Sequence, residues 1–299
     1  MADFSGRTVI VAGGAGTLGR AISLAFAKAG ANVVVNDLGC STEGEGSSTE
    51  PAEAVAEEIR QITGGPDRVL ACSESVLQAD KIIDATISKF GRVDAIINAV
   101  GMLYYGPFEE QSQSVLEKTF QTNTLGPILL IQRAWALFKK QRYGRVVNFA
   151  SDSIYGMPNS SAYVMTKGAL LGLNKSLALE GAPFGITVNC VGPCAYGRQN
   201  ERNFADLPPE QQQGFKDAYT PESNVAMILA LAHPSNTFTG ECFSVGNFRV
   251  DRTILGITGG AKNIRTLEDC LEHTKEIYQK GSQIHELSSV VDLLVFKQL

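Results

Sequence analysis

A doubly wound α/β domain is the fold class that the sequence predicts, on three observations. Short runs of β-branched and other apolar residues alternate with helix-like stretches over most of the 299 residues. These runs are apolar throughout, which indicates a parallel sheet covered on both faces. A glycine-rich turn, Ala12–Gly19, follows the first run and leads into a helix. We therefore expect a mainly parallel seven-stranded sheet with helices on both faces.

Each element is placed by its own residue pattern. β-Branched runs mark the strands, and apolar residues at helical spacing mark the helices. The first helix ends before Gly30, which suits a helix C-cap. The predicted strands are Thr8–Ala12, Asn32–Asn36, Arg68–Cys72, Val93–Ala99, Arg145–Ala150, Ile186–Val191 and Cys242–Val245. The predicted helices are Leu18–Ala29, Pro51–Ile62, Ala79–Phe90, Ser114–Gln141, Ser161–Glu180 and Pro221–Ala232.

Two segments depart from this alternation. Residues 39–50 are rich in Gly, Ser and Glu, which predicts a surface loop. After about residue 250, strands and helices no longer alternate. We expect one sheet domain over residues 1–250. We also expect a helical C-terminal extension over residues 251–299, packed on the same domain or on a partner subunit.

Composition narrows the classes of partner and the cell compartment. The net charge is −5 and no cluster of Lys and Arg is longer than two residues, so we expect no nucleic-acid partner. The apolar runs are too short for a membrane span, and no signal peptide is visible. The six cysteines lack metal-ligand spacing, which favours free thiols and no metal. The final tripeptide, Lys297–Leu299, shares only Leu with the S-K-L peroxisomal signal, so we expect a cytoplasmic protein.

The glycine-rich turn is a candidate phosphate site. Glycines allow a tight turn and let the backbone approach a pyrophosphate, and the following helix offers N–H groups and a positive dipole end. An ordinary strand-to-helix turn is the alternative, but the position after the first strand favours a dinucleotide. The candidate residues of the turn are Gly13, Ala15, Gly16, Thr17, Leu18 and Gly19.

The end of the second strand indicates which nucleotide binds. Asp37 lies eighteen residues after Gly19, where a carboxylate can accept hydrogen bonds from ribose hydroxyls and repel a 2′-phosphate. No Lys or Arg near Asp37 favours that phosphate, although Arg20 could contact phosphates. We therefore expect NAD, with NADP less favoured.

A proton-transfer pair lies on the predicted helix after the fifth strand. Tyr163 and Lys167 have i, i+4 spacing, which places both side chains on one helix face. A neighbouring ammonium favours the phenolate, so we expect Lys167 to lower the pKa of Tyr163. Ser151, at the carboxyl end of the fifth strand, can hydrogen-bond a substrate oxygen, and Ser153 is the competing candidate.

Taken in order, these motifs resemble the short-chain dehydrogenase/reductase family over roughly residues 5–250. Besides the turn, the resemblance rests on residues 98–101, Asn123, Ser151, the Tyr163–Lys167 pair and Val188–Pro193. It implies a catalytic tetrad in a Rossmann fold. In that tetrad Asn123 holds a water linked to Lys167, Ser151 orients the carbonyl, Tyr163 transfers the proton, and Lys167 binds the ribose.

The same resemblance implies further cofactor contacts, together with departures from the family pattern. Ala12 replaces a threonine, Thr17 replaces the second glycine, a single Asn98 stands where two asparagines are usual, and Val100 replaces Ala. Because Thr17 adds bulk, weaker NAD binding is one expectation. Outside the turn, the implied cofactor residues are Asp37, Leu38, Glu74, Ser75, Asn98, Ala99, Gly101, Tyr163, Lys167 and Pro193.

A narrower resemblance concerns the substrate. Residues 36–39 with the following insertion, Ser153–Gly156, Leu170–Leu173 and the C-terminal extension resemble the (3R)-hydroxyacyl-CoA dehydrogenase unit of peroxisomal multifunctional enzymes of type 2. This implies an acyl-CoA substrate oxidised with NAD. A ketone reductase or alcohol dehydrogenase acting on a small lipophilic carbonyl or alcohol is the first alternative. A nucleotide-binding regulator or non-redox catalyst is the second. Family resemblance also implies a homodimer or homotetramer.

Overall fold

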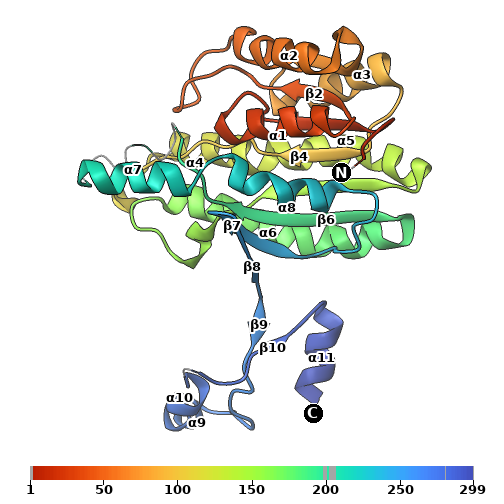
Figure 1. Ribbon diagram of the computed structural model, residues 1–299. Coiled ribbons are helices and arrows are strands. Elements are labelled where there is room, and N and C mark those ends of the chain that lie inside the picture. Colours follow the sequence, from red (N-terminus) through yellow and green to blue (C-terminus); the bar gives the residue numbers. More distant parts are fainter. Residues whose placement is uncertain (1–2, 198–200, 202–206, 280, 299) are drawn as a thin grey trace. The chain divides into compact units, whose positions relative to one another are not determined.

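An eight-stranded, mainly parallel sheet forms the centre of the computed structural model, which describes residues 3–197, 201, 207–279 and 281–298. The strand order is β3-β2-β1-β4-β5-β6-β7-β8, and helices cover both faces (Figure 1). The doubly wound fold class is confirmed. The strands are β1 (Thr8–Ala12), β2 (Asn32–Asn36), β3 (Val69–Cys72), β4 (Ala95–Asn98), β5 (Gly144–Phe149), β6 (Ile186–Pro193), β7 (Cys242–Gly246) and β8 (Arg249–Thr253).

The prediction of seven strands was one too few. The eighth strand, β8, has the sequence Arg-Val-Asp-Arg-Thr and lies at the edge of the sheet. Its residues are exposed or half-buried, because an edge strand with charged side chains has no face in the core. Such a strand carries no apolar run, so the pattern that revealed the other seven does not mark it.

Helices alternate with the strands along the sheet domain. The predicted helix Ser114–Gln141 is divided by a π-helical turn, η4 (Gln121–Leu125), and helix α7 lies in a Gln-rich stretch where none was predicted. The helices are α1 (Thr17–Lys28), α2 (Glu50–Thr63), α3 (Ala79–Phe90), α4 (Gln113–Phe120), α5 (Gly126–Gln141), α6 (Ser161–Gly181), α7 (Pro209–Ala218) and α8 (Glu222–Ala232).

Two hydrophobic cores lie on opposite faces of the sheet, and alternate residues of each central strand supply them. In β1, Val9 and Val11 join the core that contains the buried faces of α1, α2 and α8. Ile10 and Ala12 join the second core, with apolar residues of α3 and α5. All four side chains are fully buried. Side chains of a strand point to alternate faces, so a strand covered on both sides must be apolar at every position.

The order of the strands places a crevice between β1 and β4. Both strands are parallel and paired, with Val9 opposite Ala95 and Ala12 opposite Asn98. The chain leaves β1 through α1 on one face, whereas β4 and β5 are reached through α3 and α5 on the other face. In such sheets the crevice at the carboxyl ends of the strands, where the order reverses, is the usual ligand site.

The C-terminal extension is a separate unit over residues 253–299. It contains a two-stranded antiparallel sheet of β9 (Gly256–Ile257) and β10 (His285–Glu286). Its helices are α9 (Leu267–Glu272), α10 (Thr274–Ile277) and α11 (Val290–Gln298). Several large apolar side chains of the unit are exposed: Leu255, Leu267, Leu271, Tyr278, Ile284, Val290 and Val291. The homo-oligomer expected from the sequence stays a prediction.

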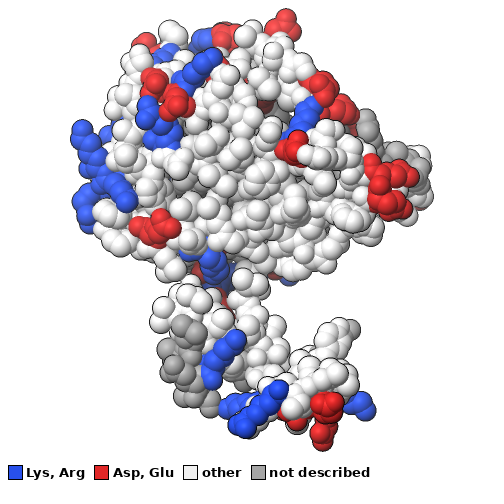
Figure 2. Space-filling view, turned by 180° about the vertical axis from the view of Figure 1, so that it is seen from behind, with Lys and Arg blue, Asp and Glu red and all other residues white. Residues whose placement is uncertain are grey.

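Charged side chains are spread over the surface. On the face drawn in Figure 2, basic and acidic residues lie mostly toward the margins, and the centre of that face is largely uncharged. This distribution agrees with the small net charge of −5. In the part of the chain that the structure describes, no helix is both long enough and apolar enough to cross a bilayer.

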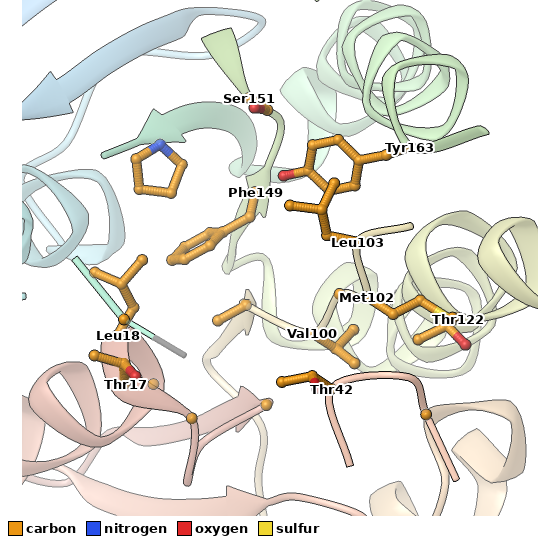
Figure 3. A pocket seen from close by; sticks show the side chains of 18 of the residues that line it. Thr17, Leu18, Thr42, Val100, Met102, Leu103, Thr122, Phe149, Ser151 and Tyr163 are labelled. Carbon is orange, nitrogen blue, oxygen red and sulfur yellow. The ribbon is translucent and has the colours of Figure 1, made fainter. Parts of the chain in front are cut away.

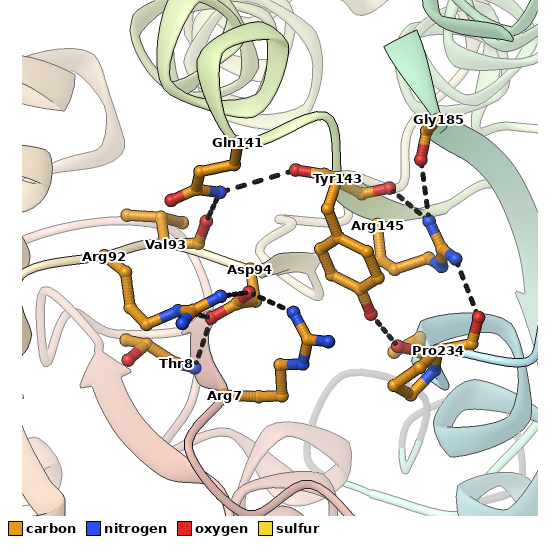
Figure 4. Close-up of polar contacts among 12 residues, drawn as sticks. Arg7, Thr8, Arg92, Val93, Asp94, Gln141, Tyr143, Arg145, Gly185 and Pro234 are labelled. Carbon is orange, nitrogen blue, oxygen red and sulfur yellow. Dashed lines mark hydrogen bonds and ion pairs between the residues drawn. The ribbon is translucent and has the colours of Figure 1, made fainter.

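A polar network closes the amino-terminal edge of the sheet, at the opposite end of the strands from the crevice (Figure 4). Asp94, which is 1% exposed, accepts hydrogen bonds from Arg7, from Arg92 and from the backbone N–H of Thr8, at 2.7 to 2.9 Å. Nearby, Arg145 is buried and donates to the carbonyl oxygens of residues 144, 185, 233 and 234. The network thus joins β1, β4 and β5 at their starts.

Replacing Asp94 by Ala tests this network. The change leaves a buried N–H and two arginines without their acceptor, so we expect the free energy of unfolding to fall by about 2–4 kcal/mol. Urea denaturation measures the change. Asp80→Ala is the matched control, because Asp80 pairs with Arg133 at the surface, where ion pairs contribute little. Equal stability of the two variants would contradict a structural role for Asp94.

Candidate functional site

The crevice contains a cavity of about 470 Å³ at the carboxyl edge of the sheet. Segments that follow β1, β2, β3, β4, β5 and β6 line it, together with two residues of α6. In Figure 3, Ser151 and Tyr163 lie at one side of this pocket and Thr17 and Leu18 at another. Residues distant in sequence are therefore brought to a single site.

The turn after β1 fits tightly between its neighbours. Gly13 has a φ of +76°, and an added Cβ would lie 2.9 Å from the backbone nitrogen of Val100. At Gly19 an added Cβ would lie 1.9 Å from the carbonyl oxygen of Gly13. Only glycine fits at these two positions. The helix that follows begins at Thr17, so its first N–H groups have no intrahelical acceptor, and Thr17, Leu18 and Gly19 of its first turn line the pocket.

Thr17 occupies the position where the family pattern has a glycine, and the structure accommodates it from the opposite side. An added Cβ at Gly197 would lie 2.9 Å from the Thr17 hydroxyl and 3.1 Å from its Cβ. The Thr17 side chain thus lies against the segment that follows β6. The glycine that permits this approach is Gly197.

Asp37 follows β2 and is held by the backbone around it. One carboxylate oxygen accepts a hydrogen bond from the N–H of Ala15 at 3.0 Å, and the other accepts one from the N–H of Gly39 at 2.9 Å. The carboxylate therefore links the glycine-rich turn to the next loop. Its remaining lone pairs can accept further hydrogen bonds from a ligand in the pocket.

The loop after Asp37 forms a wall of the pocket. The N–H of Ser48 donates to the carbonyl of Leu38 at 3.0 Å, which closes the loop at its base. Glu45 forms an ion pair with Lys118 of α4. Figure 3 shows Thr42 of this loop beside the pocket, near Val100. Residues 40, 41, 42 and 44 line the cavity, so this segment is more than the surface loop expected from its composition.

Tyr163 is hydrogen-bonded to Ser151, which distinguishes the two candidate serines. The Ser151 hydroxyl also accepts a hydrogen bond from the N–H of Ser153 at 3.1 Å. The hydroxyl of Ser153 is buried and has no hydrogen-bond partner among the described residues. Burial raises the pKa of Tyr163, and the hydrogen bond with Ser151 opposes that rise. Of the two candidate serines, Ser151 is therefore the one whose hydroxyl contacts Tyr163.

Lys167 is buried on the same helix as Tyr163. Its Nζ donates to the carbonyl of Phe149 at 2.7 Å and lies 5.4 Å from the centre of the Tyr163 ring. Burial lowers the pKa of Lys167 to about 8. Burial dominates the pKa of Tyr163, so that pKa is raised rather than lowered. Both shifts favour the uncharged form of each side chain.

Asn123 acts as a connector within the protein. It lies in the π-helical turn η4 and is fully buried. Its amide oxygen accepts a hydrogen bond from the N–H of Met102 at 2.8 Å, and its amide nitrogen donates to Met102 O and to Thr166 Oγ1 at 2.9 and 3.1 Å. The amide thus joins the segment after β4 to α6. The second lone pair of the amide oxygen can still accept a hydrogen bond, for example from a water.

Most of the predicted residues line the pocket, and three do not. Ala15 contributes its N–H to Asp37, Asn98 donates to Asn148 inside the sheet at 2.7 Å, and Asn123 is the connector described above. The predicted residues that line the pocket are Gly13, Gly16, Thr17, Leu18, Gly19, Asp37, Leu38, Glu74, Ser75, Ala99, Gly101, Ser151, Tyr163, Lys167 and Pro193.

Several lining residues were missed by sequence reasoning. They include residues 40, 41, 42 and 44 and a second, mostly apolar group. Position directly after a strand end is the signal that could have indicated the first set. The second set follows no motif: Met102, Leu103, Tyr105, Met157, Cys194, Ala195 and Phe215.

Comparison with known proteins places the chain in a family. A short chain dehydrogenase model matches residues 7–205. The chain is 36% identical over 249 residues to the peroxisomal hydratase-dehydrogenase-epimerase of Neurospora crassa, covering 83% of this chain and 27% of that protein. It is 35% identical over 244 residues to mouse (Mus musculus) peroxisomal multifunctional enzyme type 2, covering 81% and 32%. The chain thus spans about a third or less of these relatives.

Solved structures give the same fold. The full-length peroxisomal multifunctional enzyme type 2 of Drosophila melanogaster matches with a TM-score of 0.80 at 23% identity, covering 99% of this chain and 50% of that one. A short chain dehydrogenase from Mycobacterium avium matches with a TM-score of 0.77 at 25% identity, covering 95% and 98%.

The expectation of a cytoplasmic protein was wrong. It rested on the final tripeptide, Lys297–Leu299, and on the spacing of the cysteines. The relatives described above are named as peroxisomal enzymes, which contradicts this expectation. Three residues and a cysteine pattern are too little evidence to assign a compartment.

The fold, the glycine-rich turn, the Ser151–Tyr163–Lys167 arrangement and the family model agree over most of the sheet domain. The chain belongs to the short-chain dehydrogenase/reductase family of oxidoreductases.

Proposed function

We propose that the chain oxidises a 3-hydroxyacyl thioester to the 3-ketoacyl thioester with NAD. The observation that carries the proposal is the Tyr163 hydroxyl, bonded to Ser151 at the edge of a largely apolar pocket. The opposite end of the pocket holds a fixed carboxylate, Asp37. The relatives that match the chain carry hydratase-dehydrogenase names, which favours a hydroxyacyl substrate.

The residues present fit a dinucleotide. The glycine-rich turn has no side chain where Gly13 and Gly19 meet their neighbours, and a pyrophosphate can approach this backbone and the start of α1. Asp37 can accept hydrogen bonds from the adenosine ribose hydroxyls, and its charge disfavours a 2′-phosphate. Leu38, Glu74 and Ser75 lie at the same end and would border the adenine. NAD is therefore the proposed nucleotide.

In the proposed mechanism, Tyr163 accepts the proton of the substrate hydroxyl. Bound NAD would supply the acceptor for the hydride that leaves the carbinol carbon of the substrate. Tyr163 takes the hydroxyl proton, so the alcohol becomes a carbonyl as its C–H and O–H bonds break. Ser151 holds the substrate oxygen beside Tyr163. Lys167, held by Phe149 O, contributes positive charge that favours the phenolate and can reach the ribose hydroxyls.

A ketone reductase or alcohol dehydrogenase acting on an uncharged lipophilic molecule is the second candidate. One observation favours it: Lys167 is the single cationic side chain among the described residues that line the pocket. Coenzyme A carries phosphates that basic side chains at the pocket mouth would favour. Arg198 and Arg202, named from the sequence as candidates for that role, lie outside the described residues.

Two measurements on the purified full chain test the proposal. NADH and NADPH are titrated separately by nucleotide fluorescence, and we expect NADH to bind at least about tenfold more tightly because Asp37 repels a 2′-phosphate. A (3R)-hydroxyacyl-CoA is then compared with an uncharged secondary alcohol of equal chain length, and we expect a higher kcat/KM for the thioester. A preference for the alcohol would favour the second candidate. Binding of neither nucleotide would favour a non-redox role.

Tyr163→Phe tests the proton-transfer role. The phenyl ring keeps the shape of the pocket but cannot accept a proton, so we expect kcat to fall by a factor of about 10³ while the Kd for NADH changes less than about twofold. Tyr155→Phe is the matched control, since Tyr155 is exposed and does not line the pocket. Turnover retained by Tyr163→Phe would rule out the mechanism.

The pH dependence of oxidation separates the two serines. Oxidation requires deprotonated Tyr163, so kcat/KM should rise with pH. The hydrogen bond with Ser151 lowers the pKa of Tyr163, so its loss in Ser151→Ala should move the rising limb to higher pH. Ser153→Ala should leave the limb in place. A shift in the second variant alone would show that Ser153 is the functional serine.

A further inference from the structure

Asp152 is a carboxylate that lines the pocket next to Ser151. The mechanism described above does not use it. This residue directly follows Ser151, begins the short helix η5 (Asp152–Tyr155) and lines the pocket. One of its carboxylate oxygens accepts a hydrogen bond from the hydroxyl of Ser244 in β7 at 2.6 Å. The side chain is therefore anchored to the strand beside β6.

The other carboxylate oxygen lies close to the end of β6. An added Cβ at Gly192 would lie 2.6 Å from Asp152 Oδ1. Gly192 is one residue before Pro193, which also lines the pocket. The carboxylate of Asp152 thus lies between the Ser244 hydroxyl and the backbone of Gly192.

The other acidic residues that line the described pocket, Asp37 and Glu74, form hydrogen bonds or ion pairs with other groups. Asp37 binds two backbone N–H groups at the opposite end, and Glu74 pairs with Lys81. Asp152 is the carboxylate nearest in sequence to Ser151, and Ser244 gives it a neutral partner rather than a cation. Its charge acts within the pocket: burial raises the pKa of the lining thiol Cys194, and the charge of Asp152 raises it further.

We propose that Asp152 sets the redox preference of the nucleotide pocket by stabilising the oxidised nicotinamide over the reduced one. This inference rests on the proposed function. The oxidised ring carries a positive charge and the reduced ring is neutral, so a fixed carboxylate at this end favours the oxidised form. Lys167 lies at the same end with the opposite sign, and Asp152 offsets its repulsion of the cation. The bias favours alcohol oxidation.

The test compares the Kd values of NAD⁺ and NADH for the full chain and for Asp152→Asn. Asparagine keeps an oxygen acceptor for Ser244 and the size of the side chain, but not the charge. We expect the ratio of the NADH Kd to the NAD⁺ Kd to fall about tenfold, mainly through weaker NAD⁺ binding. An unchanged ratio would overturn the proposal. If Asp152→Asn does not fold, Asp152→Ser is measured in its place with the same expectation.

Two controls separate charge from structure. Glu180→Gln removes an exposed carboxylate of α6 that also accepts a hydrogen bond from a serine, Ser176, but does not line the pocket, and it should change neither Kd. Ser244→Ala removes the anchor and keeps the charge, so the ratio should stay closer to that of the unmodified chain than in Asp152→Asn. If Asp152→Asn weakens both nucleotides equally, Asp152 has a structural role only. Absence of nucleotide binding by the unmodified chain would contradict the proposed function instead.

Discussion

The close contact between the turn after β1 and the segment after β4 is the constraint on which the site depends. Gly13 meets the backbone of Val100, and Gly19 meets the carbonyl of Gly13, at distances that leave no space for a side chain. The two segments leave the sheet side by side at the point where the strand order reverses. Gly13, Gly19 and Val100 all line the pocket, so this contact forms part of its wall.

The two edges of the sheet illustrate how polar groups divide between stability and chemistry. At the amino-terminal edge, the Asp94 carboxylate accepts hydrogen bonds from two arginines and a backbone N–H, and Arg145 donates to backbone carbonyl oxygens. At the carboxyl edge, the buried hydroxyl of Ser153, which lines the pocket, has no partner among the described residues. An unpaired buried polar atom carries a free-energy cost, which a hydrogen bond to a bound ligand would remove.

The sequence predicted those parts of the fold that depend on short-range patterns. Apolar runs located seven strands because each faces two cores, and the spacing of Tyr163 and Lys167 placed them on one helix. The eighth strand has no apolar pattern, and the π-helical turn at Asn123 arises from contacts with Met102 and Thr166 that are distant in sequence. The wall made by residues 40–44 depends likewise on an ion pair with α4.

The charges of the pocket also depend on tertiary structure, and they give the site its direction. Burial raises the pKa of Tyr163 and lowers that of Lys167 to about 8, so near neutral pH the tyrosine is protonated and the lysine mostly charged. A second cation entering this end would favour the phenolate, which oxidation requires, but it would also be repelled by Lys167. We propose above that the carboxylate of Asp152, which lines the same pocket, reduces that repulsion. On that proposal, Asp152 and Lys167 together would let a positively charged ring bind where its charge promotes proton transfer.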